Sequence, residues 1–404
     1  MNHFDRLTRA LGLLIALTPL AGCMMDDDDA STTPSPIECA RSDAGAPGET
    51  DAAQGTAGDG AVPRARLSPP ARIELLALGA EKYRGKAVVA EEQRVGDAVR
   101  VRFDPESGPL CLRSAEYAAF YVDRGSRDTV VLLEGGGACW SGLCAAEETA
   151  DEMVRAVGPA LDDPGNPFRD WNLVFAPYCD GSVFWGDNDL TEADGRPRHH
   201  RGQQNLAAAF DLAEAQFADS DRVLVAGFSA GGYATLRGML SARLMFPDAE
   251  LLVLNDSGPA LQNPSETTAI EQRLAEWKFA ATIPASCSAC EEGRGHQSAM
   301  YDWLLERDPS VQIALLSYFE DPVIGKAFNN LDGPAYEALL REQTDPIAAE
   351  YPDRFRRFML PGNRHVVMFD LPDVSAAGVK LSAWLSAFAD DDADGWRDVL
   401  ADGP

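Results

Sequence analysis

The chain has 404 residues, of which 45% are hydrophobic, and its 64 acidic residues outnumber the 35 basic residues to give a formal net charge of −29. A chain of this size and apolar content can bury one large core. The negative charge argues against a nucleic-acid partner, whose phosphates would be repelled, and indicates a solvent-facing protein without specifying its fold.

The first 22 residues have the pattern of an export signal. Two arginines precede an apolar run over residues 10–20, which is too short to span a membrane. The run ends in Leu-Ala-Gly followed by Cys23, which resembles the lipobox of bacterial lipoproteins and implies cleavage before Cys23 and its lipidation. Met24 rather than Asp comes next, which by the same resemblance indicates the outer membrane or cell surface. The alternative is an ordinary cleaved signal with an incidental cysteine.

Residues 23–70 predict a flexible tether. The segment is rich in Asp, Ser, Thr, Pro, Gly and Ala and has almost no large apolar side chains from residue 26 onward. Burial cannot offset the entropy of ordering such a stretch. Membrane contact is therefore expected only through a lipid on Cys23, and residues 71–404 are expected to form one folded domain.

Strand-like and helix-like runs alternate along this domain. The expected strands are residues 99–103, 117–122, 129–134, 172–177, 222–226, 251–255, 312–317 and 355–360. The expected helices are residues 148–157, 203–216, 233–245, 267–279, 336–343 and 379–388. Near-continuous apolar strands that alternate with helices predict an α/β domain whose mostly parallel sheet has helices on both faces.

The most informative motif is Gly-Phe-Ser-Ala-Gly at residues 227–231. An apolar strand leads into it and a helix follows at once, which is typical of the nucleophile elbow of α/β-hydrolases. The flanking glycines are needed because side chains there would clash with the strand and helix. The motif predicts Ser229 as a nucleophile and the N–H of Ala230 as an oxyanion donor, whereas the simpler interpretation is a glycine-rich turn.

A second glycine motif follows the expected strand 129–134. Glu134 and three consecutive glycines match the oxyanion loop of the H-G-G-G type, with Glu in place of His. Glycines let backbone N–H groups approach a substrate oxygen without obstruction by a Cβ. Gly136 and Gly137 are therefore predicted to join Ala230 as oxyanion donors, the alternative being a plain glycine turn.

His365 is the best candidate for a general base. The chain has five histidines, and His365 lies in a loop just after the strand expected at residues 355–360. Loops at the carboxyl ends of strands collect catalytic side chains in open α/β sheets. His365 also follows Ser229 and several acids, which is the chain order of α/β-hydrolase triads.

Three acids are candidates for the partner of His365. Asp321 ends an apolar run directly before a proline and is favoured. Asp256 is interpreted as a former of an Asx-type turn, and Glu320 as pointing away. The chosen acid must be buried and bonded to the imidazole, so that it fixes the tautomer and stabilises the imidazolium.

The cysteines beyond Cys23 fit an oxidising compartment, in which disulfides form. They fall into two close pairs, one conjectured distant pair and a remaining residue: Cys139 with Cys144, Cys287 with Cys290, Cys111 with Cys179, and Cys39. The C-x-x-C spacing of the second pair could instead indicate redox or zinc chemistry. A structural bridge is favoured because there is no second C-x-x-C and no histidine at zinc-finger spacing.

A calcium-loop pattern near the C-terminus is interpreted as an acidic surface. Asp390, Asp392, Asp394 and Gly395 match the start of the loop, but Ala401 stands where a bidentate Glu is required. The sequence thus predicts neither a metal nor a cofactor.

Together these motifs resemble the pectin acetylesterase/Notum family of carboxylesterases. The matching stretches span nearly all of the domain and are L-L-E-G-G-G-A-C-W (132–140), N-P-F-R-D-W-N-L-V-F-A-P-Y-C-D-G-S-V-F-W-G-D (166–187), G-F-S-A-G-G-Y (227–233), N-D-S-G (255–258), S-Y-F-E-D (317–321) and P-G-N-R-H (361–365). The resemblance implies an α/β-hydrolase fold, a triad of Ser229, Asp321 and His365, and pairing of Cys139 with Cys144.

The resemblance also implies a substrate class. Family members hydrolyse O-acyl esters on polysaccharides or, for Notum, on a lipidated protein. The Notum-like aromatic residues are missing at Gly137 and Ala138, which favours a short acyl group such as acetyl. Trp140, Tyr178 and Trp185 are candidates for lining the site, or are simply core aromatics.

The sequence therefore predicts a serine carboxylesterase that acts on O-acyl, and in particular O-acetyl, esters of an acylated carbohydrate or another small ester. A catalytically inactive surface lipoprotein that binds glycan is the alternative, although a binder has no need for an oxyanion loop. A peptidase is a weaker third possibility.

Overall fold

The computed structural model of the protein describes residues 67–150, 163–371 and 373–401. The predicted export signal, the lipidation site Cys23, the tether up to residue 66 and Cys39 lie outside these residues. So does most of the helix expected at 148–157. Within the described part of the chain, no helix combines the length and apolar character needed to cross a membrane.

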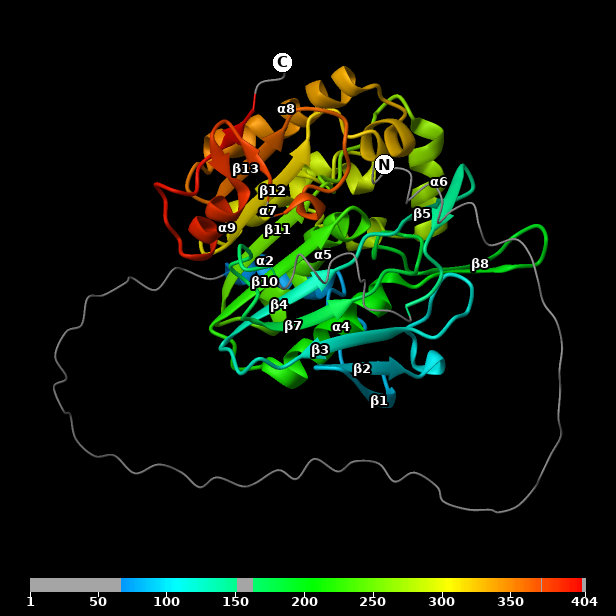
Figure 1. The fold of residues 1–404 in the computed structure, drawn as a ribbon. Coiled ribbons are helices and arrows are strands. Elements are labelled where there is room, and N and C mark those ends of the chain that lie inside the picture. Colours follow the sequence, from blue (N-terminus) through cyan, green and yellow to red (C-terminus); the bar gives the residue numbers. More distant parts are fainter. Residues whose placement is uncertain (1–66, 151–162, 372, 402–404) are drawn as a thin grey trace, which may run out of the picture. The chain divides into compact units, whose positions relative to one another are not determined.

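A ten-stranded sheet forms the centre of the domain, and Figure 1 shows its strands running from β1 at the bottom to β13 near the top. Their order is β1 (Val89–Val95), β2 (Ala98–Phe103), β3 (Ala118–Val122), β7 (Asn172–Ala176), β4 (Asp128–Leu133), β10 (Arg222–Phe228), β11 (Glu250–Asp256), β12 (Gln312–Tyr318), β13 (Phe355–Leu360) and β16 (Val399–Leu400). The pairs from β1 to β7 are antiparallel, and those from β7 to β16 are parallel. The predicted α/β-hydrolase-like fold is confirmed.

Alternate residues of the central strands pack into two separate cores. In β4, Val131 and Leu133 belong to one cluster of buried side chains, whereas Val130 and Leu132 belong to the other. The same alternation holds in β10, β11 and β12. Burial on both faces explains why these strands are apolar at nearly every position.

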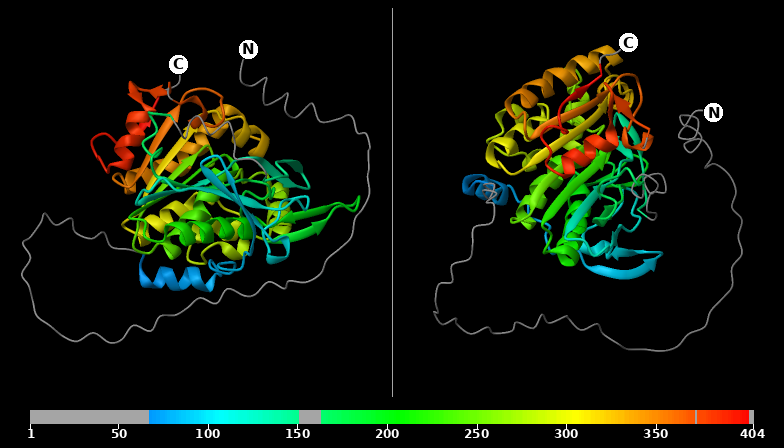
Figure 2. Two further views of the ribbon diagram at one scale, coloured as in Figure 1. Left: turned by 60° about the horizontal axis from the view of Figure 1, so that its bottom comes forward. Right: turned by 60° about the vertical axis from the view of Figure 1, so that its left-hand side comes forward.

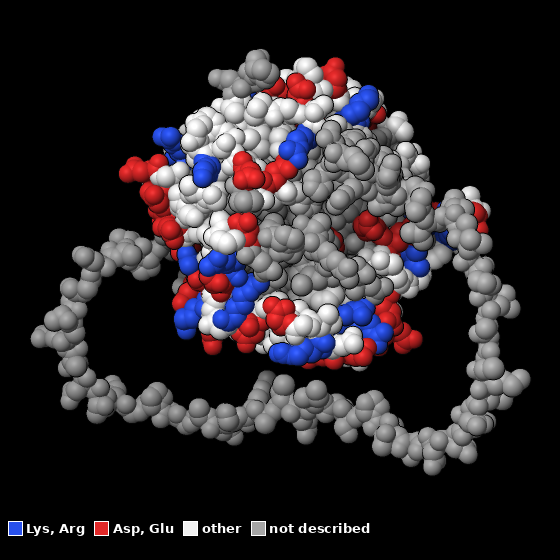
Figure 3. All heavy atoms as spheres, in the orientation of Figure 1, with Lys and Arg blue, Asp and Glu red and all other residues white. Residues whose placement is uncertain are grey.

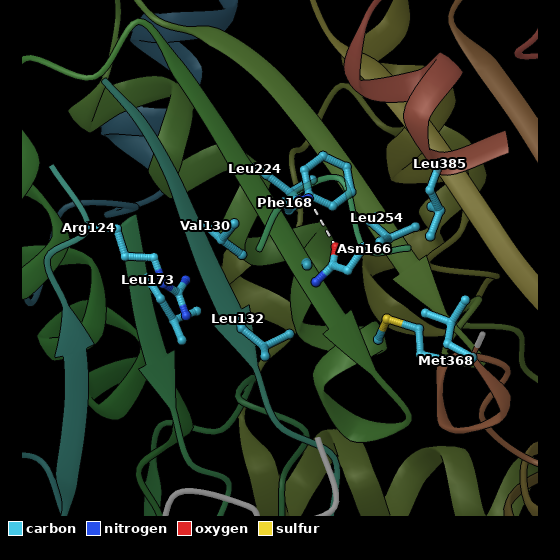
Figure 4. A pocket seen from close by; sticks show the side chains of 12 residues that line it. Arg124, Val130, Leu132, Asn166, Phe168, Leu173, Leu224, Leu254, Met368 and Leu385 are labelled. Atoms are coloured by element: carbon cyan, nitrogen blue, oxygen red, sulfur yellow. Dashed lines mark hydrogen bonds between the residues drawn. The ribbon is translucent and has the colours of Figure 1, made fainter. Parts of the chain in front are cut away.

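Helices cover both faces of the sheet, as the turned views in Figure 2 show. Among the described residues, the helices that contribute to the larger core are α2 (Pro69–Ala77), α4 (Gly202–Phe217), α5 (Ala230–Met245), α6 (Thr267–Trp277), α7 (Ala299–Arg307) and α8 (Gly333–Glu350). Helix α9 (Leu381–Ala389) packs on the opposite face. That face holds an apolar pocket between the strands and Phe168, Met368 and Leu385, shown in Figure 4.

Several elements were not expected from the sequence. Strand β1 has the polar sequence VAEEQRV and is exposed throughout, so no apolar pattern marks it. Strand β16 has only two residues and pairs with β13, so β13 is not the last strand of the sheet. Helices α2 and α7 were also missed.

Three disulfides join the pairs considered from the sequence. Cys139–Cys144, Cys287–Cys290 and Cys111–Cys179 are bonded. The first closes the hairpin of β5 (Gly137–Trp140) and β6 (Leu143–Ala146), where the two cysteines face each other. A further hairpin of β8 (Asn188–Thr191) and β9 (Pro197–His200) projects from the domain in Figure 1.

Acidic and basic side chains are interspersed on the molecular face drawn in Figure 3. Ion pairs such as Arg127 with Asp221 and Arg222 with Asp128 place opposite charges side by side. Charges of both signs are therefore mixed on this face, although the chain as a whole is acidic.

Candidate active site

Ser229 occupies a strained turn between strand β10 and helix α5. Its φ of 56° lies in the left-handed region, which is uncommon for a residue with a side chain. A Cβ added to Gly227 would lie 2.2 Å from the carbonyl oxygen of Gly231, and one added to Gly231 would lie 2.0 Å from the carbonyl oxygen of Leu133. Only glycine fits at either position, so the turn has the steric signature of a nucleophile elbow.

Helix α5 begins at Ala230, directly after Ser229. The first N–H groups of a helix have no partner within the helix and carry a partial positive charge. The N–H of Ala230 is therefore available to an oxygen that approaches Ser229. The N–H of Ser229 itself donates to the carbonyl of Asp256 on the neighbouring strand, at 2.9 Å.

His365 connects Ser229 to Asp321. Its Nε2 lies 2.8 Å from the hydroxyl oxygen of Ser229, and its Nδ1 lies 2.7 Å from a carboxylate oxygen of Asp321. When Nδ1–H donates to the carboxylate, the lone pair of Nε2 is free to accept the hydroxyl proton. The imidazole of His365 is 18% exposed, whereas the carboxylate of Asp321 is fully buried. Because Ser229 is also partly exposed, the three hydrogen-bonded side chains are accessible to solvent at the serine.

Asp321 is held in a fixed orientation by the backbone that follows it. Its second oxygen, Oδ1, accepts the N–H groups of Val323 and Ile324 at 2.8 and 3.1 Å. These residues begin the short helix η4 (Val323–Phe328). One oxygen is thus anchored by the chain while the other faces His365.

The other two acids considered from the sequence do not reach the imidazole. The side chain of Glu320 is partly exposed and lies against Gly333 at the start of α8, where an added Cβ would be 2.7 Å from its Oε2. The interpretation of Asp256 as an Asx-type turn former is wrong, because its carboxylate accepts no N–H from the residues just after it; the neighbouring Asn255 accepts the N–H of Gly258 at 3.0 Å. The carboxylate of Asp256 accepts from the loop after His365 instead.

The glycine loop packs directly against the elbow. A Cβ added to Gly135 would lie 2.7 Å from the Cβ of Ser229, and one added to Gly136 would lie 2.6 Å from the ring of Tyr178. Gly137 has a φ of +82° and would clash with Ala145 across the hairpin. Gly135, which had no role predicted from the sequence, is thus the glycine of this loop that packs against Ser229; the run of three glycines was the only signal for it.

Glu134 lies below this loop at the end of β4. It is buried, and its carboxylate accepts the N–H of Tyr178 at 2.9 Å. Burial raises the pKa of Glu134 to about 8, despite this backbone hydrogen bond and with a further increase from Glu147. The residue that replaces the usual His of the motif therefore holds the backbone at Tyr178, in the segment that follows β7.

Two of the three aromatic candidates lie around a small cavity next to α5. Its lining is mainly aromatic and consists of Val183, Trp185, Tyr233, Gln262, Arg273, Trp277, Phe279, Gln297 and Phe328. Trp185 donates to the carbonyl of Tyr233, one turn beyond Ser229, at 3.0 Å. Trp140 packs edge-on against Trp277 and Phe328. Tyr178 is fully buried, and its hydroxyl accepts the N–H of Val183, so it supports the region from within the core.

Arg273 is an unusual feature of this cavity. It is 2% exposed, and its guanidinium lies over the rings of Trp140 and Phe328 at 5.1 and 4.7 Å. It forms no ion pair with any residue in the described ranges; its polar partners are Gln262 and the carbonyl of Phe328. Desolvation lowers the pKa of Arg273 to about 10. No sequence signal distinguished this arginine from others in a helix.

The described residues bring one group of possible metal ligands within coordinating distance, Cys139, Cys144 and Glu192. The two sulfurs are already joined to each other. Thiolates rather than disulfide sulfurs bind metals, so this group does not form a metal site.

Comparison with known proteins finds similarities over a region that includes Ser229. Residues 90–277 match the family model described as Pectinacetylesterase. The chain is 30% identical over 218 residues to pectin acetylesterase 5 of Arabidopsis thaliana, a match that covers 46% of this chain and 51% of that protein. It is 31% identical over 170 residues to pectin acetylesterase 4 of the same plant, covering 38% and 41%.

A further similarity extends to the other branch of the expected family. The chain is 26% identical over 234 residues to palmitoleoyl-protein carboxylesterase notum1 of Xenopus laevis, covering 48% of this chain and 46% of that protein. The chain spans about half the length of the curated relatives it matches. The matches confirm the resemblance to the pectin acetylesterase/Notum family. The family model includes the glycine loop and Ser229 and ends before Asp321 and His365.

Proposed function

We propose that this chain, whose residues 90–277 match the pectinacetylesterase family, is a serine carboxylesterase that uses Ser229, His365 and Asp321. The observation that carries the proposal is the unbroken chain of hydrogen bonds from the hydroxyl of Ser229 through the imidazole to the buried carboxylate. This geometry is what general-base activation of a serine requires.

The reaction follows from the positions of these groups. His365 takes the hydroxyl proton as Ser229 attacks the ester carbonyl, and it returns the proton to the departing alcohol. Asp321 keeps Nδ1–H directed toward itself and stabilises the imidazolium. Water then attacks the acyl-enzyme and gives its proton to His365, and the bond to Ser229 breaks as His365 returns a proton to the Ser229 oxygen, which releases the acid.

The oxyanion of the tetrahedral intermediate is assigned to backbone donors. The N–H of Ala230 at the start of α5 and those of Gly136 and Gly137 are the proposed donors. The contact of Gly135, the residue directly before these two glycines, with Ser229 supports this assignment. Loss of one such donor typically raises the barrier by about 3–4 kcal/mol.

The proposed substrate is an O-acetyl ester on a polysaccharide or another small acylated carbohydrate. Pectin acetylesterases among the relatives motivate the acetyl group. Aromatic rings and the buried Arg273 crowd the cavity beside α5, and such a cavity does not suit a long fatty chain. Hydrolysis rates for p-nitrophenyl esters should accordingly fall as the acyl chain is lengthened from acetyl to palmitoyl.

The esterase proposal is tested by active-site labelling together with turnover. A fluorophosphonate should label the wild type and not Ser229→Ala, and p-nitrophenyl acetate turnover should fall about 10⁴-fold in that variant. Equal labelling of both proteins would contradict the assignment of Ser229. Cleavage of amide substrates at comparable rates would favour a peptidase.

A surface protein that only binds glycan is the alternative of a different class. It predicts retention on an acetylated polysaccharide column with no release of acetate. The contact between His365 and Ser229 favours the esterase, because binding alone does not need an activated hydroxyl.

We further propose the organisation and location expected from the sequence: a lipoprotein signal over residues 1–22, a tether over 23–70 and a catalytic domain over 71–404, held at the outer membrane or cell surface by Cys23. Cys23→Ser should move the protein from the membrane fraction to the soluble fraction. Unchanged membrane association of this variant would refute the anchor.

A further inference from the structure

Asp256 has a fully buried carboxylate that is hydrogen-bonded to neither the hydroxyl of Ser229 nor the imidazole of His365. It ends strand β11, where it pairs with Phe228, the residue before Ser229. Its side chain has no cationic ion-pair partner among the described residues, and every hydrogen bond it accepts comes from an uncharged donor. A buried carboxylate without a counter-charge is costly, and such a group calls for an explanation.

The carboxylate holds the loop that carries His365. Its Oδ1 accepts the N–H of Val367 at 2.9 Å, and its Oδ2 accepts the N–H of Met368 at 2.7 Å. The hydroxyl of Ser257 donates to Oδ1 at 2.8 Å and accepts the N–H of Val366 at 3.1 Å. The three backbone N–H groups that follow His365 are therefore all fixed by Asp256 and Ser257.

The backbone of the same residue holds the nucleophile. The carbonyl oxygen of Asp256 accepts the N–H of Ser229 at 2.9 Å. One residue thus fixes the main chain beside the reacting hydroxyl and the main chain beside the imidazole. A change in its position would alter the distance between Ser229 and His365.

The segments that Asp256 connects are strained. Ser229, Ser257 and Val366 have φ values of 56°, 57° and 67°. Val366 is β-branched and buried, for which this conformation is especially unfavourable. Such residues persist only where surrounding contacts over-determine them, and here those contacts converge on Asp256.

We infer that Asp256 is a positioning residue for the proposed esterase reaction, whose carboxylate keeps the loop of His365 in register with Ser229. The expected effect of Asp256 on the reaction rate rests on the proposed function. Its expected effect on the position of the His365 imidazole rests on hydrogen-bond geometry alone. Burial raises the pKa of Asp256 to about 6, so at neutral pH both oxygens are available as acceptors.

Asp256→Asn is the direct test. An amide has one acceptor oxygen, so one N–H of the loop loses its partner while the size of the side chain is kept. A displacement of about 1 Å in an active site can reduce the rate about 10²-fold. We expect kcat for p-nitrophenyl acetate to fall about 10- to 100-fold while KM changes less than about 3-fold. Ser257→Ala should give a smaller fall in kcat.

Asp308→Asn is the matched control for stability. Asp308 is also fully buried and accepts the N–H and hydroxyl of Ser310. Unlike Asp256 it is paired with Arg243, and it lies near the amino end of β12, away from His365. The Asp308→Asn substitution should lower Tm at least as much as Asp256→Asn does. It should leave kcat unchanged at temperatures where both variants are folded. Unchanged kcat in folded Asp256→Asn, or an equal loss in Asp308→Asn, would overturn the inference.

A spectroscopic measurement separates this inference from the esterase proposal. In protein with ¹⁵N-labelled histidine, the Nδ1–H that His365 donates to Asp321 should give a protected low-field proton signal in the wild type and Asp308→Asn. The signal should be lost or shifted in Asp256→Asn. An unchanged signal in Asp256→Asn would overturn the positioning role. If the signal changes as expected but the wild type hydrolyses no ester, the positioning role stands and the esterase proposal is refuted.

Discussion

Helix α5 runs between the carboxyl ends and the amino ends of the parallel strands, and buried charged groups have different partners at these two ends. In its last turn, Arg243 is 2% exposed and donates to Asp308 at 2.5 Å, to Ser310 and to the carbonyl of Ala249. Just before its first turn, Ser229 contacts His365, and the carboxylates of Asp321 and Asp256 are bonded only to N–H or hydroxyl donors and the imidazole.

The difference concerns strain as well as charge. Arg243, Asp308 and Ser310 have ordinary backbone conformations, and the charges of the arginine and the aspartate neutralise each other. At the carboxyl end, Ser229 and Val366 have positive φ values. The amino end is built as a satisfied structural network, and the carboxyl end keeps strained groups in a fixed geometry, as reactive sites commonly do.

Asp321→Asn should show the largest effect at the carboxyl end. The amide cannot stabilise the imidazolium and disfavours the correct tautomer, so kcat for p-nitrophenyl acetate should fall about 10⁴-fold. Thermal unfolding should change little by comparison. A variant that kept more than about a tenth of wild-type kcat would remove Asp321 from the proposed mechanism.

Arg243→Met should show the opposite pattern at the amino end. It leaves the buried charge of Asp308 without its partner, which should lower the free energy of unfolding by about 3–5 kcal/mol. Because the site lies at the other end of α5, kcat/KM should stay within about 2-fold of wild type when the protein is folded. Urea denaturation with parallel kinetics measures both, and a large loss of kcat/KM would show that the two ends are coupled.

Glu134→Gln tests a third buried carboxylate at the carboxyl end. Burial raises its folded pKa from 4.5 to about 8, so the folded protein retains a proton that the unfolded chain loses between these pH values. The free energy of unfolding should therefore fall by about 1.4 kcal/mol per pH unit from this group across that window. The stability it contributes is present below about pH 4.5 and lost as pH rises through about 8.

The amide variant mimics the protonated carboxyl at every pH. It should therefore match the wild type in stability below about pH 4.5, become the more stable of the two as pH rises above this value, and reach its full advantage at about pH 8. Urea denaturation of both proteins at a series of pH values measures the difference. Parallel stability curves would contradict the buried, protonated state of Glu134.

Replacing Cys139 and Cys144 together by Ser should give the smallest effect. The bridge closes a short loop, with a sequence separation of 5, so chain entropy predicts a loss of about 2 kcal/mol. Because β5 follows the glycine loop directly, we also expect a modest fall in kcat. Calorimetry of the variant and the wild type would measure the stability change, and an increase in Tm would be inconsistent with the bridge supporting the loop.

Much of the fold could be predicted because its signals are local. The continuous apolar runs of β4, β10, β11 and β12 reflect burial on both faces, and the ends of β13 coincide with the expected 355–360. The elbow can be recognised from its local sequence because only glycine fits at positions 227 and 231. By contrast, β1 and β16 carry too little apolar pattern to be seen.

The sequence by itself determined the alternation of strands and helices, the glycine-flanked serine and the order in which nucleophile, acids and histidine follow one another. The tertiary structure decided which acid faces His365, which glycine of the loop packs against Ser229, how the buried Asp256 is bonded, and where Arg273 lies. The physical reason is that backbone conformation and burial leave local patterns in a sequence, whereas contacts between residues far apart in the chain depend on how parallel strands align their ends.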